Sequence, residues 1–582
     1  MSKPTAKVDV QTLQRRVRVA LGQEPGDLVL RGGQVVNVFT KQVEPANVVI
    51  ADGWIAGVGP YEWPAHHTVS LSGQAILPGF IDAHMHLEST LLLPGELAKV
   101  IVPRGTTTVL ADPHEIANVA GVAGIELLFD ASTGLPLDVF FMAPSCVPAS
   151  GWESAGAVLD SGAVEKLLKH PRVLGLAEMM NFPGVINQQP EVLQKIVGAC
   201  LKGVPVDGHA PGLTGQQLVA YAAAGIRSDH ESTTIDEAIA KAGLGMLVQV
   251  REGSSARNLD TFLPLLVEDR LGDWCLATDD IHVDDLMDHG HMDGLLRRVV
   301  AAGVHATRAV RHVSLIPARH YGMTDRGAVA PGYRADLFVV QDLIGFEAHT
   351  VIKNGEIVAR NGQYEVQGEL PTVALENTVR LAQPEEKDFE LRPSGDQCPV
   401  IGIVPDNIVT RHESCTVRVD PETKCWVFDP ERDVSLVACV ERHRATGRVG
   451  VGLARGFGFH RAGALGSSVA HDAHNLVVAG TNPGDMLACI RALEQMGGGL
   501  VVVSAGSVVA HLPLQVAGLV STRDFRTVRR QLDEVTGAAR SLGCALPAPF
   551  GTLSFLCLSV IPELRITDRG VFDVVRQQII VL

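Results

Sequence analysis

The sequence predicts an α/β fold in which a (β/α)8 barrel of the TIM type is joined by a small β-sandwich domain and a C-terminal α+β domain. Three observations lead to this prediction. Eight short apolar runs, separated by helical stretches, occur between residues 75 and 278. Short β-rich pieces lie on both sides of that region, and a mixed segment of strands and helices follows. The length of 582 residues is too great for one hydrophobic core, so several domains are expected.

The composition is that of a globular protein and excludes several classes of partner. Hydrophobic residues make up 46% and charged residues 20% of the chain, and the net charge of −16 gives no sign of a nucleic-acid-binding surface. Residues 1–5 lack the apolar core of a signal peptide. Polar residues interrupt the most apolar stretch, near 500–520, so we expect a buried strand pair there and no membrane span. Ten cysteines without a CxxC pair indicate free thiols and a cytoplasmic protein.

The N-terminal segment, residues 1–75, combines one helix with short strands. Apolar residues recur at helical spacing over residues 8–22. β-rich pieces follow at 27–37, 46–50 and 54–58, with Gly and Asp between them as in turns. We expect this segment to supply the helix and the first part of the β-sandwich domain.

Apolar runs predict the eight strands of the barrel, which we expect over residues 76–322. Such runs separated by helices are typical of buried parallel strands, and eight units match the size of a (β/α)8 barrel. An open, doubly wound sheet is the alternative, but no Gly-rich phosphate loop follows the first run. The runs lie at residues 75–82, 107–111, 139–143, 173–177, 204–207, 226–229, 246–250 and 274–278.

Short strands with turns return after the barrel. Two pieces, residues 327–340 and 351–358, are expected to complete the β-sandwich domain, whose second part spans residues 323–380. Pro and charged residues near 384–400 are typical of a linker. The C-terminal α+β domain is expected over residues 381–582.

Residues of metal-ligand type stand at the predicted carboxyl ends of five strands, where a barrel of this kind carries its active site. The first strand leads into His84 and His86, which point the same way in an extended chain and can bind one metal together. A lone HxH pair is weak evidence, but the agreement of five strand ends is not expected by chance. The six residues are His84, His86, Glu178, His209, His230 and Asp279.

Four imidazoles and two carboxylates suffice for two divalent ions about 3.5–4 Å apart, with a carboxylate and a water between them. Mixed nitrogen and oxygen ligands without thiolate suit Mn²⁺, Fe²⁺ or Zn²⁺, and the ligand types alone do not choose among them. We expect two divalent ions per subunit, with Mn²⁺ placed before Fe²⁺ and Zn²⁺.

Several segments resemble a known family. Residues 78–86, PGFIDAHMH, are similar to the first-strand signature of the amidohydrolase superfamily, and residues 332–337, GYRADL, resemble its return to the small β domain. Three further segments resemble bacterial adenine deaminases: residues 86–90, HLEST, residues 111–119, ADPHEIANV, and residues 470–475, AHDAHN. The resemblance covers essentially the whole chain, including the C-terminal domain that most members of the superfamily lack.

The resemblance implies a role for each metal ligand. The two histidines of the first strand, with Asp279, would bind the more buried ion, and His209 with His230 would bind the second. Glu178 would bridge the ions, where many relatives use a carbamylated lysine. The sequence around Glu178 has no lysine, which argues against the dihydroorotase and hydantoinase branches.

The implied activity is the hydrolytic deamination of adenine to hypoxanthine and ammonia, in purine salvage or adenine catabolism. Two cations would lower the pKa of a bridging water and create the hydroxide that attacks C6 of the purine. Attack requires a proton on N1, because the ring cannot otherwise hold the new electron pair. Asp279 would accept the proton of the water and pass one to the leaving ammonia, and Glu115, with His114 beside it as a further acid-base candidate, would protonate N1. The same segment is also typical of a helix start with Asp112 as its cap, and both interpretations can hold together.

Further polar residues are candidates for contacts with the base. Arg251 and Ser254 lie in a polar loop after the seventh strand and can hydrogen-bond N3 or N7, although a solvated loop is the alternative. Within the segments that carry the resemblance, the substrate candidates are Glu88, Asp112, His471, Asp472 and His474. The last three precede a buried strand of the C-terminal domain. Their segment either reaches the barrel mouth, in its own subunit or a partner, or makes only local hydrogen bonds.

Two other functions stay open at this point. The same metal pair can hydrolyse another aminopurine or a cyclic amide, and some relatives are scaffold proteins with degraded metal sites. All six ligand types are present here, which disfavours a scaffold. An acidic chain does not repel an uncharged base, so adenine is the expected small-molecule partner. We also expect a homodimer or a higher homo-oligomer.

Overall fold

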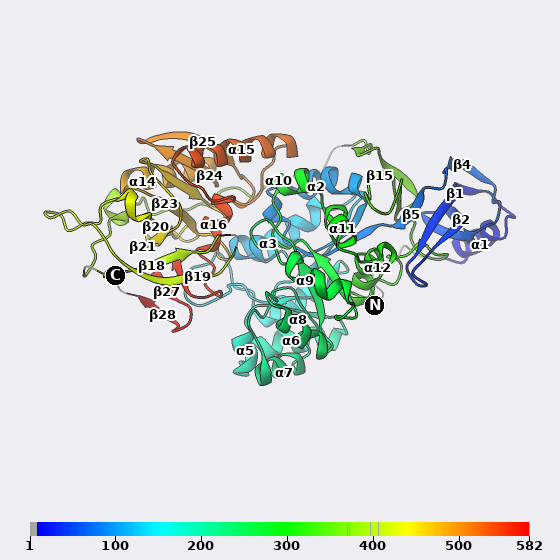
Figure 1. Cartoon of the computed structure of the whole chain (residues 1–582), viewed down its shortest axis with the longest axis horizontal. Helices are drawn as coiled ribbons and strands as arrows, with labels where there is room; N and C mark the ends of the chain where they lie inside the picture. The colour runs from blue at the N-terminus through cyan, green and yellow to red at the C-terminus, as the bar shows by residue number, and fades with distance from the viewer. Residues whose placement is uncertain (1–8, 369–370, 372, 396, 406, 581–582) are drawn as a thin grey trace.

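The structure, a computed structural model, describes residues 9–368, 371, 373–395, 397–405 and 407–580. It is elongated, with a small β domain at one end, a barrel in the middle and the C-terminal domain at the other end (Figure 1). Residues 1–5, considered above for a signal peptide, and residue 8, the first of the predicted helix, lie outside the described residues. The predicted helix is α1 (Val10–Ala20), whose cap Asp9 accepts a hydrogen bond from the Thr12 amide at 2.8 Å.

Strands from both sides of the barrel form one nine-stranded sheet. Strand β5 (Ala75–Pro78) joins the two segments, because it pairs with β1 (Gly26–Asn37) in parallel and with β14 (Leu337–Val340) in antiparallel fashion. The remaining strands are β2 (Gln42–Ala51), β3 (Trp54–Gly59), β4 (Ala65–Ser70), β15 (Ala348–Lys353), β16 (Glu356–Arg360) and β17 (Gln363–Tyr364). The apolar residues that predict strands before and after the barrel therefore meet in one sheet.

Eight parallel strands form the barrel, in two hydrogen-bonded groups. The groups are β6 (Phe80–Met85), β7 (Thr106–Ala111), β8 (Asp138–Ala143), β9 (Val173–Met179) and β10 (Val206–Gly208), and then β11 (Ser228–Asp229), β12 (Leu247–Arg251) and β13 (Trp274–Ala277). Backbone bonds connect the groups at both seams. The amide of Arg227 donates to the carbonyl of Val206 at 3.0 Å, and that of Asp279 donates to the carbonyl of His84 at 2.9 Å. The region is a barrel of the TIM type, as the apolar runs predict.

One predicted strand is two strands in the structure. The sequence predicts a single strand over residues 75–82, but β5 ends at Pro78 and β6 begins at Phe80. The amide of Gly79 donates to the carbonyl of Asp336 in the small domain, at 2.8 Å, whereas the amide of Phe80 donates into the barrel. Both strands are buried throughout, so the apolar run crosses from one core to the next without a polar break.

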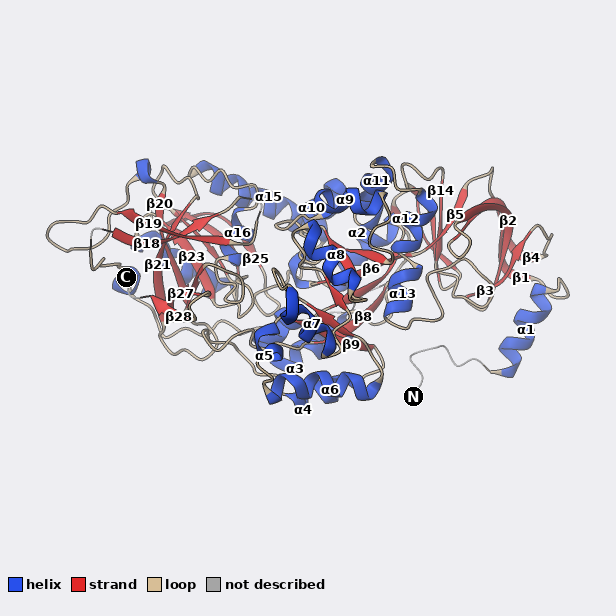
Figure 2. Cartoon of the chain, turned by 60° about the horizontal axis from the view of Figure 1, so that its bottom comes forward, coloured by secondary structure: helices blue, strands red, loops and turns tan. Residues whose placement is uncertain are grey.

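Helices between the strands cover the outside of the barrel (Figure 2). Local signals explain several of their ends. A capping box of Thr234 and Glu237 begins α8 (Ile235–Gly243), and Gly203, with φ of 68°, ends α6 (Pro190–Lys202). The other helices here are η1 (Glu88–Thr90), α2 (Pro94–Ile101), η2 (Val102–Arg104), α3 (His114–Ala131), α4 (Ser161–Leu168), α5 (Phe182–Ile186), α7 (Gly215–Ala223), α9 (Leu259–Val267), α10 (Val283–His289), α11 (Met292–Ala301), α12 (Ala306–His312) and α13 (Leu315–His320).

The C-terminal domain is built on an eight-stranded sheet and a three-stranded sheet. Strands β24 (Gly499–Ser504) and β25 (Ser507–Pro513) form an antiparallel pair, which confirms the prediction for the apolar stretch near 500–520. Within the described ranges, the chain has no helix with the length and apolar character needed to cross a membrane. The other elements are η3 (Glu386–Phe389), β18 (Gln397–Ile403), β19 (Thr410–Thr416), η4 (Pro430–Arg432), β20 (Val434–Val440), β21 (Val449–Arg455), β22 (Ala464–Ser467), β23 (Leu476–Gly480), α14 (Pro483–Met496), α15 (Phe525–Ser541), α16 (Pro549–Phe555), β26 (Leu564–Thr567), β27 (Gly570–Asp573) and β28 (Gln578–Ile580).

The predicted linker near 384–400 is part of the C-terminal domain. It contains η3 and the start of β18. Phe389 at the end of η3 is fully buried and packs in the same core as Val400. Charged residues on the exposed side of η3 give this segment the composition of a linker, while one aromatic side chain anchors it.

The C-terminal domain packs on the carboxyl ends of the barrel strands (Figure 1). The amide of Ser521 donates to the carbonyl of Leu91, after β6, at 2.9 Å. Arg529 of α15 forms an ion pair with Asp288 of α10 at 2.8 Å. The domain thus covers the end of the barrel at which active sites of this fold are formed.

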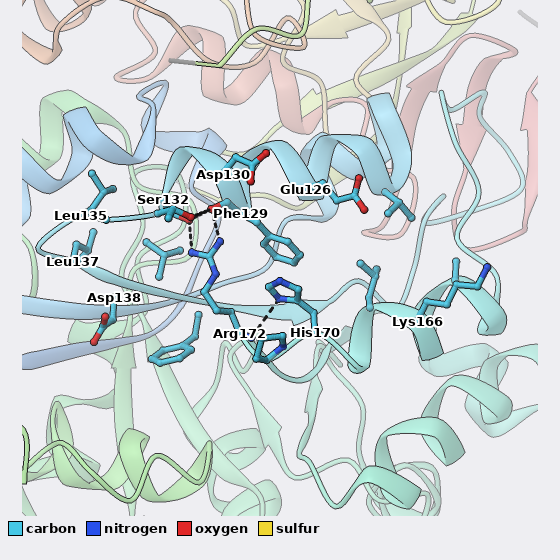
Figure 3. A pocket seen from close by; sticks show the side chains of 18 of the residues that line it. Glu126, Phe129, Asp130, Ser132, Leu135, Leu137, Asp138, Lys166, His170 and Arg172 are labelled. Carbon is cyan, nitrogen blue, oxygen red and sulfur yellow. Dashed lines mark hydrogen bonds between the residues drawn. The ribbon is translucent and has the colours of Figure 1, made fainter. Parts of the chain in front are cut away.

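A wide groove lies at the opposite end of the strands (Figure 3). It is lined by Asp138 at the start of β8 and by the segment before β9, where Arg172 donates to Oγ of Ser132 at 2.9 Å and the ring of His170 stacks on Phe129. None of the site residues predicted from the sequence lines this groove. Because the amino ends of barrel strands serve stability in this fold, we place no site there.

Candidate metal centre and active site

The six predicted metal ligands meet at the carboxyl ends of the barrel strands. His84 lies in β6 and His86 directly follows it. Glu178 lies in β9, His209 and His230 directly follow β10 and β11, and Asp279 is the second residue after β13. Each of the six side chains is buried, with at most 6% of its surface exposed. Residues that are 195 positions apart in the sequence therefore share one interior site, because parallel strands bring their carboxyl ends to the same side of the barrel.

Glu178 lies between the histidines. Its Oε2 is 2.6 Å from Nδ1 of His209 and 3.0 Å from Nε2 of His230, and its Oε1 is 3.4 Å from Nε2 of His86 and 3.9 Å from Nε2 of His84. One carboxylate oxygen thus faces the histidines after β10 and β11, and the other faces the pair of β6. This is the arrangement that a bridging carboxylate requires.

Asp279 faces the same HxH pair from the other side. Its Oδ1 is 3.2 Å from Nε2 of His84 and 3.0 Å from Nε2 of His86, and its Oδ2 accepts a hydrogen bond from Arg251 at 2.9 Å. The backbone of Asp279 has φ of 56°, in the left-handed region that few residues other than Gly adopt. Strained backbone of this kind is characteristic of functional sites.

The buried nitrogen atoms of the site fit divalent cations. Within the part of the chain that the structure describes, Nε2 of His84, of His209 and of His230 has no hydrogen-bond partner. Buried polar atoms are normally satisfied, and Nε2 of His84 and Nε2 of His230 lie within 4 Å of carboxylate oxygens, as nitrogen ligands of a shared cation would. Several groups of three or four of these side chains have ligand atoms close enough to hold an ion. Imidazole and carboxylate donors suit Mn²⁺, Fe²⁺ and Zn²⁺.

Electrostatics keeps both carboxylates ionised. Burial raises the pKa of Glu178, but His209 and His230 outweigh burial and hold it well below its usual value. Burial likewise raises the pKa of Asp279, and Arg251 and His84 outweigh it. The reverse effect acts on the histidines, where burial lowers the pKa of His230 but Glu178 raises it to about 9. A cation and a proton therefore compete for the imidazole nitrogen.

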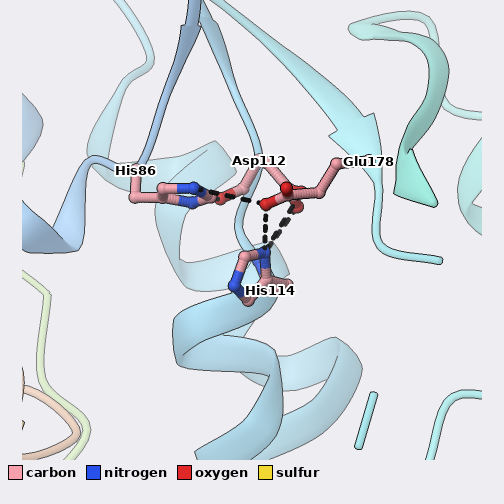
Figure 4. Close-up of side chains that lie close together, drawn as sticks. All are labelled: His86, Asp112, His114 and Glu178. Atoms are coloured by element: carbon pink, nitrogen blue, oxygen red, sulfur yellow. Dashed lines mark hydrogen bonds and ion pairs between the residues drawn. The ribbon is translucent and has the colours of Figure 1, made fainter. Parts of the chain in front are cut away.

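Asp112 and His114 form a second group against the metal site (Figure 4). Nδ1 of His114 is 3.1 Å from Oδ2 of Asp112 and 3.5 Å from Oε1 of Glu178. Together with His86 and Glu178, these two side chains make a further group with metal-ligand spacing. Asp112 was predicted as a substrate contact, but it does not line the cavity described next.

A small cavity of about 20 Å³ adjoins the metal-ligand residues. The barrel supplies His114, Glu115, Glu231, Arg251 and Asp280 to its walls, besides five of the six predicted ligands. The C-terminal domain supplies the remaining wall with Ile408, His471, Asp472, Phe555 and Leu558. This volume is far below the range that is typical of ligand pockets, about 300–1,000 Å³, so the two walls must move apart before a purine can enter.

The predicted substrate contacts divide into two groups. Arg251, His471 and Asp472 line the cavity, whereas Glu88, Asp112, Ser254 and His474 do not. Glu88 is held by the amide of Ile116, which donates to its Oε1 at 3.0 Å, and burial raises the pKa of Glu88 to about 7. Oγ of Ser254 accepts from the amide of His282 at 2.9 Å. Glu88 and Ser254 thus each have a local hydrogen-bond partner outside the cavity wall.

Arg251 is not in a solvated loop. It is the last residue of β12, only 3% exposed, and it forms ion pairs with Glu231 and Asp279. Glu231 was not predicted as a site residue. Its Oε1 is 3.9 Å from Nε2 of His230, and its Oε2 is buried without a partner in the described chain. The sequence shows an acidic residue beside a predicted ligand, but it does not show which way the side chain of that residue points.

The polar segment of residues 470–475 reaches the barrel within its own chain. Nδ1 of His471 is 2.7 Å from Oε1 of Glu115, and Nε2 of His474 contacts Oε2 of the same carboxylate. The segment connects β22 and β23, and Nε2 of His443 bonds the carbonyl of Ala473 at 2.7 Å. The C-terminal domain therefore adds titratable groups to the barrel site.

Glu178→Gln should lower metal occupancy and activity together. The substitution keeps the shape of the side chain but removes a negative charge from between two groups of histidines. Mutation of a residue that hydrogen-bonds a metal ligand typically lowers metal affinity or activity 10–100-fold, and mutation of a residue between two ions should lower them further. The measurement is metal content and turnover on one sample. Glu252→Gln is the matched control, since this buried barrel carboxylate instead accepts from the amide of Leu259 at 2.9 Å. Two retained ions and normal turnover in Glu178→Gln would rule out the bridge.

Comparisons with known proteins cover both halves of the chain. The family described as Amidohydrolase family matches residues 75–358, and the one described as Adenine deaminase C-terminal domain matches residues 407–578. Adenine deaminase 2 of Carboxydothermus hydrogenoformans is 42% identical over 560 residues, which cover 96% of this chain and 97% of that protein. Adenine deaminase of Desulfatibacillum aliphaticivorans is 42% identical over 558 residues, with 96% and 97% covered. Adenine deaminase of Nitratidesulfovibrio vulgaris is 44% identical over 563 residues, with 96% of each chain covered.

Proposed function

Because the chain belongs to the adenine deaminase family, we propose that it hydrolyses adenine to hypoxanthine and ammonia. The observation that carries the proposal is the identity of 42% to curated adenine deaminases across both the barrel and the C-terminal domain. A buried site with six residues of metal-ligand type supports a hydrolase and disfavours a scaffold protein. Hydrolysis of another aminopurine or of a cyclic amide is the rival activity.

We propose two divalent ions in the site, with Mn²⁺ placed before Fe²⁺ and Zn²⁺. The HxH pair and Asp279 would hold one ion, His209 and His230 the other, and Glu178 would lie between them. The distances around Glu178 and the unpartnered histidine nitrogens support this division. When bound, such ions lower the pKa of a coordinated water toward neutrality, which supplies a nucleophile at physiological pH.

Asp279 is placed to move a proton between the nucleophile and the leaving group. Its Oδ1 faces the HxH pair, and Arg251 holds its Oδ2 at 2.9 Å. The ion pair fixes the carboxylate and keeps it ionised, so it can accept a proton from the attacking water. The protonated Asp279 can then give that proton to the amino group that leaves C6.

Glu115 and His471 act as a unit that protonates N1 of the purine. Burial raises the pKa of Glu115, but His471 and His474 outweigh it and hold it well below its usual value. Burial lowers the pKa of His471, but Glu115 raises it to about 9. At neutral pH the proton of the pair therefore lies on His471, which lines the cavity, and Glu115 orients that ring through Nδ1.

His474 supports Glu115 and does not bind a cation with it. The amide of Ala470 donates to Nδ1 of His474 at 3.1 Å, so the proton of the neutral ring lies on Nε2 and points at Glu115. A metal ligand would need a lone pair on that Nε2. Glu115, His471 and His474 have metal-ligand spacing, but this tautomer makes them a hydrogen-bonded chain.

Two expectations about the organisation of the chain also stay proposals. We propose the boundaries 1–75, 76–322, 323–380 and 381–582 for the segments, supported by the nine-stranded sheet that draws strands from both sides of the barrel. We also propose assembly into a homodimer or a higher homo-oligomer.

Ammonia release from a panel of substrates tests the proposed function. We expect adenine to be turned over with a kcat/KM at least about 100-fold above those of guanine, cytosine and hydantoin, because a site built around one ring rejects others that leave its polar groups unpaired. Metal content is measured on the same sample to exclude an inactive preparation. Preferred turnover of another base, or of a cyclic amide, by fully metallated protein would overturn the assignment.

A further inference from the structure

One wall of the cavity belongs to the C-terminal domain and is mostly apolar. Ile408, Phe555 and Leu558 line it, and the ring of Phe555 stacks on His471 with centroids 4.6 Å apart. Among these side chains stands one carboxylate, Asp472, which is 3% exposed. An ionisable group in such a place is costly unless it has a partner.

Asp472 lines the cavity, and one oxygen of its carboxylate has no donor in the described chain. Its Oδ1 lies 3.9 Å from Nε2 of His114 and 4.0 Å from Nδ1 of His471, too far for a hydrogen bond. Its Oδ2 is buried and finds no donor among the residues that the structure describes. Since Asp472 lines the cavity, a molecule bound there is positioned to supply the missing N–H.

The ring of His114 separates Asp472 from the metal-ligand residues. Its Nδ1 faces Glu178 at 3.5 Å, and its Nε2 lies 3.2 Å from Oε1 of Glu115 and 3.9 Å from Oδ1 of Asp472. A purine whose C6 lies at the metal ligands turns its far edge toward the C-terminal domain. In adenine, N9 lies on the edge away from the 6-amino group, and in the free base N9 carries a hydrogen. In adenosine the same nitrogen carries ribose.

Resting on the proposed function, we propose that Asp472 makes the site selective for the free base, because its Oδ2 accepts the N9–H of adenine. Adenines substituted at N9 lack this donor and leave Oδ2 of Asp472 without one. Their substituent would also meet Ile408, Phe555 and Leu558. The C-terminal domain thus recognises the N9–H group, which is absent from a nucleoside.

Glu231 is the other carboxylate of the cavity with one oxygen that has no donor in the described chain, and its position gives it a different role. It directly follows His230, lies 3.7 Å from Nδ1 of His209, and holds Arg251 through Oε1. Glu231 is therefore on the metal side of the cavity, where C6 and its amino group lie. Asp472 is the acceptor on the opposite wall.

The test compares adenine with 9-methyladenine as substrates, and 9-methyladenine as a competitive inhibitor, in Asp472→Ala and Asp472→Asn. We expect the wild-type chain to prefer adenine by about 10⁴-fold or more, since a buried polar group rejects an analogue that lacks its partner. In Asp472→Ala, kcat/KM for adenine should fall about 10- to 100-fold while the constants for 9-methyladenine change little. Asp472→Asn keeps an acceptor oxygen, so its kcat/KM for adenine should lie between those of the wild type and Asp472→Ala.

The ratio between two substrates on one sample does not depend on how much of the protein is folded, so partial unfolding of a variant leaves the result interpretable. Asp568→Asn is the control, because this buried carboxylate of the same domain accepts from the amide and hydroxyl of Ser154 at 2.9 and 2.7 Å and does not line the cavity. Its ratio should equal that of the wild type. An unchanged ratio in Asp472→Ala overturns the role of Asp472, whereas a wild-type protein without adenine turnover overturns the proposed function itself.

Discussion

Removal of divalent cations is expected to abolish adenine deamination, and addition of Mn²⁺ is expected to restore it. The six ligand-type side chains are buried and converge, and four of their imidazole nitrogens have no hydrogen-bond partner in the described structure. Without a cation, the pKa of the attacking water rises from near neutrality to its much higher value in bulk water, and almost no hydroxide is present at neutral pH. Activity should therefore fall below detection after chelation, with turnover and metal content measured on the same samples.

Metal affinity should also depend on pH in a defined direction. In the metal-free site Glu178 raises the pKa of His230 to about 9, against the effect of burial, so this ring carries a proton at neutral pH. A cation must displace that proton, and the competition weakens as the pH rises toward 9. Titrations of metal-free protein with Mn²⁺ should show tighter binding at pH 8 than at pH 6. A folding control by circular dichroism accompanies them, and full activity in rigorously metal-free protein would refute the metal centre.

Glu115→Gln is expected to keep both ions and to lose turnover by about 10²–10⁴, the range typical of general acid-base groups. The carboxylate touches His471 and His474 but none of the six proposed ligands, so metal content should not change. Asp279→Asn should differ, because Asp279 faces the HxH pair directly and its loss should remove both turnover and metal. Metal analysis beside kinetics separates the two residues.

A double variant tests whether Glu115 and His471 act as a unit. His471→Asn alone should cost about as much as Glu115→Gln, and the two together should cost little more than either, since groups that act together are not additive. Glu252→Gln serves again as the buried barrel carboxylate that should leave turnover unchanged. Near-normal turnover in Glu115→Gln would return residues 112–115 to a purely structural role at the start of α3.

The barrel and its ligands could be predicted because their signals are local and periodic. Continuous burial of a parallel strand requires a short run of apolar residues, and the residue after the run lies at the functional end of the barrel. His84, His209, His230 and Asp279 all follow from this rule, although the assignment of ions to them remains a proposal. The rule fails at residues 75–82, where two strands in two cores follow one another without a polar break.

Only the tertiary structure decided which polar side chains face the cavity. Glu115 lies 356 positions from His471 in the sequence, and no periodic pattern connects a barrel loop with a loop of another domain. The residues that follow Arg251 in the sequence are polar, as in a loop at the mouth of the barrel, yet two carboxylates pair with Arg251 inside the barrel. Side-chain direction after a strand depends on which partners the assembled domains offer, and buried charges take the partners that offset their desolvation. The sequence by itself therefore determined the residue types and the end of the barrel that holds them, and the packing of the C-terminal domain determined their pairing.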